Sequence, residues 1–317
     1  MVPRVAATAL TIGGLLLPAG GCARYRARPL DPGIHAAAHR ARRMDNAELR
    51  AWVNRYAGPL RDGGWTDRQL GIAALAQRAD LERARREWLA ARASAAAAGA
   101  RPPPGVEGGV EHAVGGRDEG SPWVVSLAGL FTLELGGKRA ARLQAARARE
   151  AAAEAELALL VAGTLGQVRE AALAVRHAEA SQDQAVSEVA ALRRIEELER
   201  DRFAEAALGS ADVARTASEV MTASAQAATR ESEVLRARAA LAAALAVSPD
   251  QVRALPLEPE AQAGCAWGSA VGADSLATLA LVRRGEVAAA LAGYAGAEAD
   301  VRARMAAQYP DLELGPG

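Results

Sequence analysis

The side chains that could do chemistry in this sequence are few and far apart. Its histidines and cysteines are His35, His39, His112, His177, Cys22 and Cys265. Only His35 and His39 have a spacing that could serve one metal ion, and the segment around them is a poor frame for a site. No nucleophile–base arrangement, glycine-rich phosphate loop or acidic pair with a positioning scaffold is present. The sequence therefore predicts no catalytic residue, no metal site and no cofactor.

Three glutamates, Glu107, Glu111 and Glu134, belong to the stretch with the clearest two-residue period. Across residues 105–135, apolar residues alternate with others on both sides of the turn-like segment 115–118. A period of two is typical of strands, so the sequence predicts a β-hairpin. The glutamates occupy the less apolar positions, for which a solvated face is the ordinary explanation.

Charge and composition exclude several classes of protein. The 317 residues carry 38 Lys and Arg against 38 Asp and Glu, so the formal net charge is zero. A nucleic-acid-binding protein needs a basic excess for its phosphate contacts. Two cysteines are too few for a disulfide scaffold or a cysteine-rich zinc module. The residues are 50% hydrophobic but only 3% aromatic, which favours closely packed alanine-rich helices over one large globular core.

The first 21 residues have the organisation of a signal peptide. A positively charged start is followed by an apolar segment, residues 5–17, that is too short to span a bilayer. Small residues then precede Cys22 and resemble a bacterial lipobox, so we expect this cysteine to be lipidated and to anchor the chain. The alternative is simple cleavage, with Cys22 removed or free. We expect residues 22–65 to form an extended tether with one short helix near Asn46 to Tyr56.

A first repeat, residues 66–247, places helices on both sides of the hairpin. Thr66 is a good cap for a helix over 67–100, which a run of three prolines ends. After the hairpin, residues 138–208 contain no proline and predict one helix about 105 Å long.

Gly209 and Ser210 follow this long helix. We expect Gly209 to end it as a C-cap glycine and Ser210 to cap a further helix over 210–247. The two shorter helices together match the long one in length, which predicts a rod with the hairpin at one end. Residues 248–273 form a connector.

The chain contains an internal repeat. Shifted by 206 positions, residues 74–109 match 280–315 without a gap, including Arg78 with Arg284 and Trp88 with Tyr294. Residues 274–317 therefore read as the start of a second repeat. If it matched the first, about 135 further residues would follow, so we expect the chain to be truncated at its C-terminus.

Three motifs resemble the TolC family of outer-membrane efflux channels, and most closely the exit ducts of metal-type RND exporters. They are LELGGKR at 133–139, RFAEAALGSADV at 202–213 and AAQYPDLELGPG at 306–317. The resemblance covers residues 66–317. It implies a mainly α protomer with very long coiled-coil helices and a membrane β-hairpin, here with an incomplete second repeat.

The resemblance also implies partners and sites. Such protomers form a homotrimer that closes a barrel in the outer membrane and continues as a helical tunnel into the periplasm. The family's periplasmic adaptor and inner-membrane RND pump would dock at the helix turn, here Leu208, Gly209 and Ser210. Glu107, Glu111 and Glu134 would face the lumen and give a weak preference for cations. The expected function is passive export of metal ions or small molecules across the Gram-negative outer membrane, without enzymatic activity.

Two features depart from the family pattern and keep alternatives open. The second strand pair is absent, and the hairpin has few aromatic residues at its ends, whereas membrane barrels carry aromatic girdles. The alternatives are a structural coiled-coil lipoprotein without a transport role, a periplasmic adaptor lipoprotein, and a degenerate channel that does not function. An adaptor would flank its helices with β-rich domains, which this sequence lacks.

Overall fold

The structure is a computed structural model that describes residues 31–60, 64–112, 123–258 and 272–315. The predicted signal peptide and Cys22 lie outside the described residues, so both stay predictions. The chain divides into two compact units, residues 1–38 and 39–317. Helix α1 (Pro32–Arg40) begins in the first unit, where the Gly33 backbone N–H donates to the Asp31 carboxylate at 2.7 Å.

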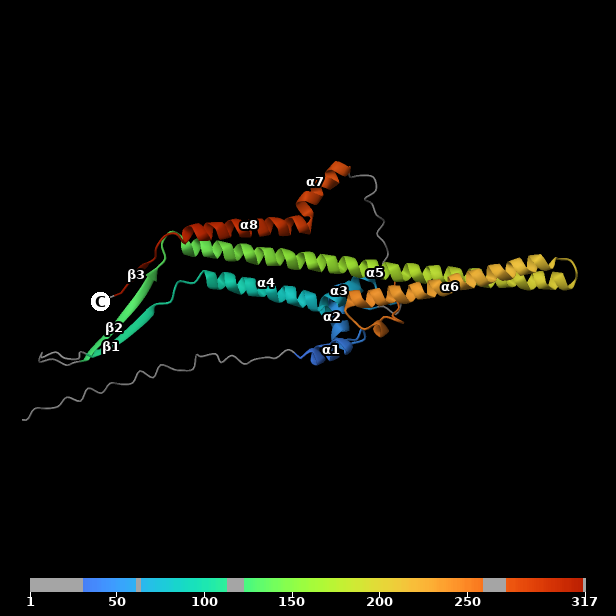
Figure 1. The fold of residues 1–317 in the computed structure, drawn as a ribbon, viewed down its shortest axis with the longest axis horizontal. Helices are drawn as coiled ribbons and strands as arrows, with labels where there is room; N and C mark the ends of the chain where they lie inside the picture. Colours follow the sequence, from blue (N-terminus) through green and yellow to red (C-terminus); the bar gives the residue numbers. More distant parts are fainter. Residues whose placement is uncertain (1–30, 61–63, 113–122, 259–271, 316–317) are drawn as a thin grey trace, which may run out of the picture. The chain divides into compact units, whose positions relative to one another are not determined.

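The second unit is mainly helical and carries one small sheet (Figure 1). Its helices are α2 (Ala47–Ala57), α3 (Asp67–Gln77), α4 (Ala79–Ala98), α5 (Lys138–Ala204), α6 (Ser210–Leu245), the short 3-10 helix η2 (Pro249–Gln251), α7 (Ala273–Arg283) and α8 (Gly285–Ala306). Its strands are β1 (Gly105–His112), β2 (Trp123–Leu133) and β3 (Leu312–Leu314). The predicted fold class, long helices with a β-hairpin, is confirmed.

Helix α5 is the centre of this unit. It has 67 residues, which corresponds to about 100 Å, and it contacts α3, α4, α6 and α8 (Figure 1). Val168, Ala172 and Val175 lie on one stripe of α5 and are fully buried, whereas Leu165 remains 38% exposed. By length and composition alone α5 would also qualify as a membrane-spanning helix. Part of its apolar surface, including Val168 and Val175, packs against the other helices.

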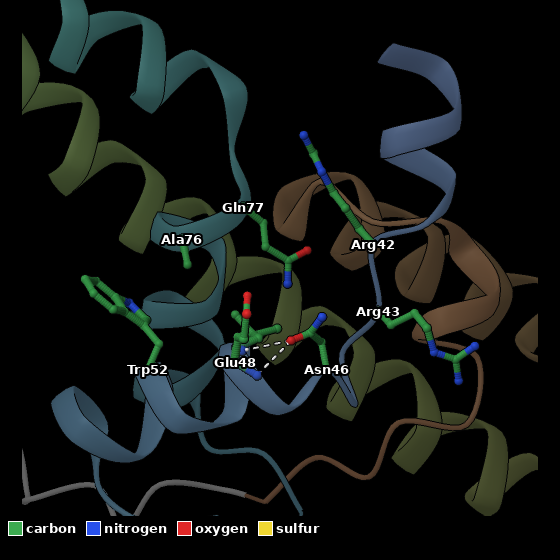
Figure 2. A pocket seen from close by; sticks show the side chains of 8 residues that line it. Arg42, Arg43, Asn46, Glu48, Trp52, Ala76 and Gln77 are labelled. Carbon is green, nitrogen blue, oxygen red and sulfur yellow. Dashed lines mark hydrogen bonds between the residues drawn. The ribbon is translucent and has the colours of Figure 1, made fainter. Parts of the chain in front are cut away.

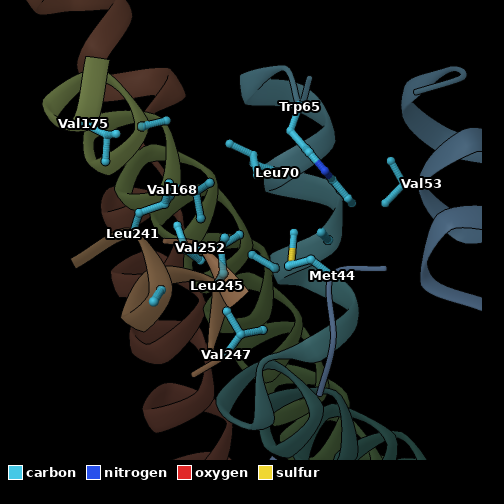
Figure 3. Close-up of a cluster of buried hydrophobic side chains, with 14 of the residues drawn as sticks. Met44, Val53, Trp65, Leu70, Val168, Val175, Leu241, Leu245, Val247 and Val252 are labelled. Carbon is cyan, nitrogen blue, oxygen red and sulfur yellow. The ribbon is translucent and has the colours of Figure 1, made fainter. Parts of the chain in front are cut away.

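A single hydrophobic cluster lies where α2, α3, α5 and α6 meet (Figure 3). Its buried members are Met44, Leu49, Val53, Trp65, Leu70, Ala73, Ala74, Val168, Ala172, Val175, Leu241, Ala242, Leu245, Val247 and Val252. The sequence predicts an extended tether up to residue 65 with one short helix near Asn46 to Tyr56. The structure has this helix as α2, but the helix is packed and does not belong to a free tether. Because Asn46 caps α2 and the helix buries Leu49 and Val53, part of the predicted tether belongs to the core.

Two ion pairs connect helices around this cluster. Arg176 of α5 donates to both carboxylate oxygens of Asp67 in α3, at 2.7 and 3.0 Å. Arg238 of α6 pairs with Glu179 of α5 and also donates to the Val252 carbonyl at 2.6 Å. The pairs fix the rotation of α3 and α6 about their axes relative to α5.

The predicted helix over 67–100 is two helices in the structure. Thr66 caps the first as expected, with a capping box completed by Gln69. Arg78 then adopts an extended conformation, and α4 begins at the next residue. The sequence signal was weak because residue 78 is neither glycine nor proline.

The internal repeat is visible in this break. Arg284, 206 positions after Arg78, is extended as well and separates α7 from α8. Arg78 pairs with Asp80 at 2.5 Å, and Arg284 pairs with Glu286 at 3.6 Å. The backbone N–H groups of the two arginines donate to the carbonyls of Ala74 and Ala280 respectively. The two copies therefore share backbone geometry and ion pairing.

Candidate functional site

The strands form one antiparallel sheet in the order β1–β2–β3. The register sets Val110 opposite Val125 and Phe131 opposite Leu314. Opposed residues share a face and neighbours alternate, so one face, the apolar sheet face, carries Val106, Val110, Val125, Leu127, Phe131, Leu133, Leu312 and Leu314, all about half exposed or more. A continuous apolar face of this kind marks contact with lipid or with another protein.

The predicted lumen residues differ in their surroundings. Glu107 is exposed and lies on the face opposite the apolar sheet face, together with Ser126 and Glu313. Glu111 belongs to β1, but its side chain is outside the description. Glu134 follows β2, and its carboxylate pairs with Arg142. The position of these side chains in the lumen of a channel stays a prediction.

Four charged residues, Glu134, Lys138, Arg142 and Asp311, form what we name the junction cluster, where β2 turns into α5. Arg142 donates to both oxygens of Glu134, with Nη2 3.2 Å from Oε2. Lys138 Nζ lies 2.8 Å from Asp311 Oδ1. The Leu135 N–H donates to the same oxygen at 3.4 Å. The cluster thereby ties the β2–α5 turn to the segment between α8 and β3.

Arginines of the first α5 turns also close the end of α4. Arg142 Nε donates to the Ala98 carbonyl at 3.0 Å, and Arg139 Nε donates to the Gly99 carbonyl at 2.6 Å. These groups would otherwise be unpaired at the negative end of the helix dipole. Sequence analysis missed Arg142. An available signal was the charge of Arg142, which is opposite to that of Glu134 and lies about one turn into the helix that begins at Lys138.

We expect the junction cluster to loosen in acid. The Arg142 guanidinium lowers the pKa of Glu134 below its ordinary value of 4.5, and the Lys138 ammonium lowers the pKa of Asp311 below 3.8. A carboxyl group whose pKa is lowered by folding stabilises the folded state at pH values above its ordinary pKa. That stabilisation is lost as the pH falls through the lowered pKa. The protection of the amides of residues 135–142, measured as the ratio of the intrinsic to the observed exchange rate at each pH, should therefore fall below about pH 4. In Lys138→Met this protection should already be low at neutral pH; equal protection profiles in both proteins would contradict this.

Two consecutive glycines make the β2–α5 turn, with φ of 66° at Gly136 and 72° at Gly137. An added Cβ at Gly136 would collide with the Tyr309 ring, whereas one at Gly137 would meet nothing within 4 Å. Both alanine variants incur left-handed strain of about 1–2 kcal/mol. Only Gly136→Ala must also displace Tyr309, so it should unfold more easily than Gly137→Ala by a further about 1–3 kcal/mol. Thermal unfolding of the two variants measures this difference, and equal melting temperatures would contradict it.

The predicted docking tip, Leu208 to Ser210, lies between α5 and α6, and its helix ends differ from expectation. Helix α5 stops at Ala204. The left-handed residue is Ala206, with φ of 59°, and the Ala207 N–H donates to the Arg202 carbonyl at 2.8 Å. Gly209 is extended and precedes α6 as its N-cap. The prediction of Gly209 as a C-cap glycine is thus wrong, and Ser210 is the first helical residue and not the cap.

Replacing Ala206 by glycine should stabilise the chain. Alanine at a left-handed helix end has a steric cost that glycine avoids, so Ala206→Gly should raise the free energy of unfolding by about 0.5–1 kcal/mol. Ala207→Gly is the matched control, because φ is not positive at residue 207. A higher melting temperature is expected for the first variant only. A lower one for Ala206→Gly would contradict the assignment.

A hollow of about 310 Å³ beside α2 and α3 is lined by Arg42, Arg43, Asn46, Trp52 and Gln77, among others (Figure 2). Most of its polar groups serve the fold. Asn46 accepts from two N–H groups of α2, Arg43 pairs with Asp45, and Arg42 donates to the Ala246 carbonyl. Within the described residues, no group of three His, Cys, Asp or Glu side chains is arranged to hold a metal ion.

Known proteins share the sequence pattern and the fold of this chain. A family model described as outer membrane efflux protein matches residues 70–247, which is more than half of the chain. The chain belongs to the outer membrane efflux protein family. The matched residues run from within α3, through β1 and β2, to just past the end of α6. No curated protein sequence matches the chain.

Solved structures show the same fold at low sequence identity. The chain is similar to the outer membrane protein VceC from Vibrio cholerae, with 21% identity and a TM-score of 0.61, covering 84% of this chain and 63% of VceC. It is similar to the outer-membrane channel OprN, with 22% identity and a TM-score of 0.63, covering 92% of this chain and 66% of OprN. For CusC, described as forming a transmembrane channel, the identity is 18% and the TM-score 0.61, covering 81% of this chain and 61% of CusC. The chain thus spans less than two thirds of each of these proteins.

Proposed function

We propose that the chain is an exit-duct component of an efflux system, which lets small solutes cross the outer membrane passively. One observation carries this proposal. The sheet turns eight apolar residues to one face and Glu107, Ser126 and Glu313 to the other. A strand with one face toward lipid and one toward water has this alternation.

A three-stranded sheet leaves edges unpaired, and lipid offers no hydrogen-bonding groups to satisfy them. Closure therefore needs strands from other copies, and we propose a homotrimer as in the family resemblance. In this arrangement α5 and α6 extend into the periplasm, and Leu208, Gly209 and Ser210 at their turn dock a periplasmic adaptor and, through it, an inner-membrane RND pump. A lipid on Cys22 would anchor the chain to the outer membrane. The pump supplies the energy, so the duct itself needs no cofactor.

The exported solute is proposed as a metal ion or a small organic molecule. The carboxylate of Glu107 on the less apolar sheet face favours cations weakly. Glu111 shares the β1 strand and is included in this proposal. The charge of Glu134 is compensated by Arg142, so we expect Glu134 to contribute less.

Deletion of the native gene, followed by measurement of the sensitivity of cells to metals and to organic toxins, tests the proposal. Deletion should increase sensitivity, and the wild-type chain should restore resistance. A tip variant, Gly209→Arg, should fail to restore it while reaching the outer membrane in normal amounts. The matched control Arg215→Gln changes an exposed residue just beyond the tip and should restore resistance. Unchanged sensitivity on deletion would overturn the duct and favour a structural envelope lipoprotein.

A further inference from the structure

Besides the junction cluster, the region where the sheet meets the helices contains a hollow of about 410 Å³. Its walls are the proline-rich link between α4 and β1, the end of β2 and the start of α5. The volume is within the range of about 300–1,000 Å³ that is typical of small-molecule sites. The hollow therefore has room for a small polar ligand or for a lipid headgroup.

Two arginines in the wall have guanidinium groups available. Arg101 is exposed, and within the described residues it makes no hydrogen bond or ion pair. Arg139 uses Nε to hold the Gly99 carbonyl at 2.6 Å, which leaves its two terminal nitrogens as donors. Guanidinium groups favour phosphate because they offer several N–H donors in one plane.

The one acidic residue in the wall does not cancel this positive charge. Glu134 lines the hollow, but Arg142, which is outside the lining, donates to both of its oxygens. That pair is neutral as a unit. Arg101 and Arg139 therefore give the hollow a net positive charge, which attracts an anion.

One wall of the hollow, formed by the end of β2, is apolar. Phe131 and Leu133 line it and are also the last residues of β2 on the apolar sheet face, exposed by 59% and 51%. The apolar face thus ends at the point where Arg101 and Arg139 begin. A ligand with a phosphate beside the arginines and hydrocarbon over Phe131 and Leu133 would satisfy both parts.

We infer that this hollow binds the phosphate group of a negatively charged glycerophospholipid, with an acyl chain lying along Phe131 and Leu133. The inference rests on the proposed function, which sets the apolar sheet face in a membrane. An anionic headgroup such as that of phosphatidylglycerol fits better than a zwitterionic one, because the described residues that line the hollow offer no free carboxylate for the ammonium of the latter. The bound lipid would fix the depth at which the sheet sits in the membrane.

Titration of the purified full chain in non-ionic detergent with phosphatidylglycerol or phosphatidylcholine, with bound lipid counted by native mass spectrometry, tests the inference. The wild type should bind phosphatidylglycerol more tightly. Arg101→Gln should weaken this binding about fivefold, and the double variant with Arg139→Gln should weaken it further. The control Arg147→Gln removes an exposed charge from α5 outside the hollow and should change nothing. Circular dichroism confirms that each variant keeps its helix content.

Competition with inorganic phosphate identifies the source of the phosphate group. Failure of millimolar phosphate to displace the lipid supports the lipid site. Displacement that depends on Arg101 means that the hollow takes free phosphate, and it overturns the lipid assignment. Equal binding of both lipids, or equal loss in Arg147→Gln and Arg101→Gln, also overturns it. The sensitivity of cells is measured separately from lipid binding. Lipid binding that depends on Arg101, without any change of sensitivity on gene deletion, would overturn only the proposed duct. Increased sensitivity on deletion, without lipid binding that depends on Arg101, would overturn only the lipid site.

Discussion

Replacing Leu241 with alanine is expected to lower the free energy of unfolding by about 2–5 kcal/mol. Leu241 lies on α6, is completely buried and belongs to the cluster shared by α2, α3, α5 and α6. Removal of its branched end takes away apolar contacts and leaves a cavity, and the long helices around it cannot move inward without disturbing their other contacts. Urea unfolding followed by circular dichroism measures the loss.

Leu235 offers a matched control for this prediction. It lies on the same helix, six positions earlier, but is 56% exposed. The chemistry of Leu235→Ala is identical, yet its cost should be below about 1 kcal/mol because little area is uncovered. Similar losses of unfolding free energy in the two variants would mean that α6 does not pack on α5 through the face that carries Leu241.

Removal of the Asp67 carboxylate is the second change with a large expected effect. In Asp67→Ala the guanidinium of Arg176 loses both of its bonds, at 2.7 and 3.0 Å, while its side chain is only 19% exposed. An unpaired charge in such a place costs about 3–5 kcal/mol when fully buried. Because Arg176 keeps some contact with solvent, we expect about 2–3 kcal/mol. The melting temperature should fall accordingly.

A double variant separates the pair from the packing around it. Asp67→Leu with Arg176→Met leaves no unpaired charge, so it should be more stable than Asp67→Ala alone. The exposed pair of Arg302 and Glu298 is the surface control, and Glu298→Ala should cost less than about 1 kcal/mol. If the double variant were no more stable than the single one, the loss would come from packing and not from the unpaired arginine.

Several parts of the fold could be predicted because they depend on neighbouring residues. Alternation in residues 105–135 specifies a strand pair, since a one-residue shift would reverse both faces. The proline-free stretch after Lys138 specifies a long helix, and Thr66 specifies where α3 begins. Predictions of helix ends were poorer. Gly209 looked like a C-cap, but the backbone turns left-handed at Ala206, where the sequence has no glycine to mark it.

The candidate site was only partly predictable. Glu134 was identified, whereas its partner Arg142 was not, although Arg142 follows it by only eight positions and has the opposite charge. The hollow lined by Arg101 and Arg139 could not be predicted, because its walls come from separate elements and it exists only once the α4–β1 link, β2 and α5 have taken their places.

The sequence by itself thus determined the type of most helices and strands, the two-faced strands and the internal repeat, because periodicity and capping act over a few residues. Only the tertiary structure decided which charges of different elements meet. Asp67 and Arg176 are 109 positions apart, and Lys138 and Asp311 are 173 apart. Pairs at such separations depend on how helices rotate and pack against one another, and no local pattern encodes that rotation.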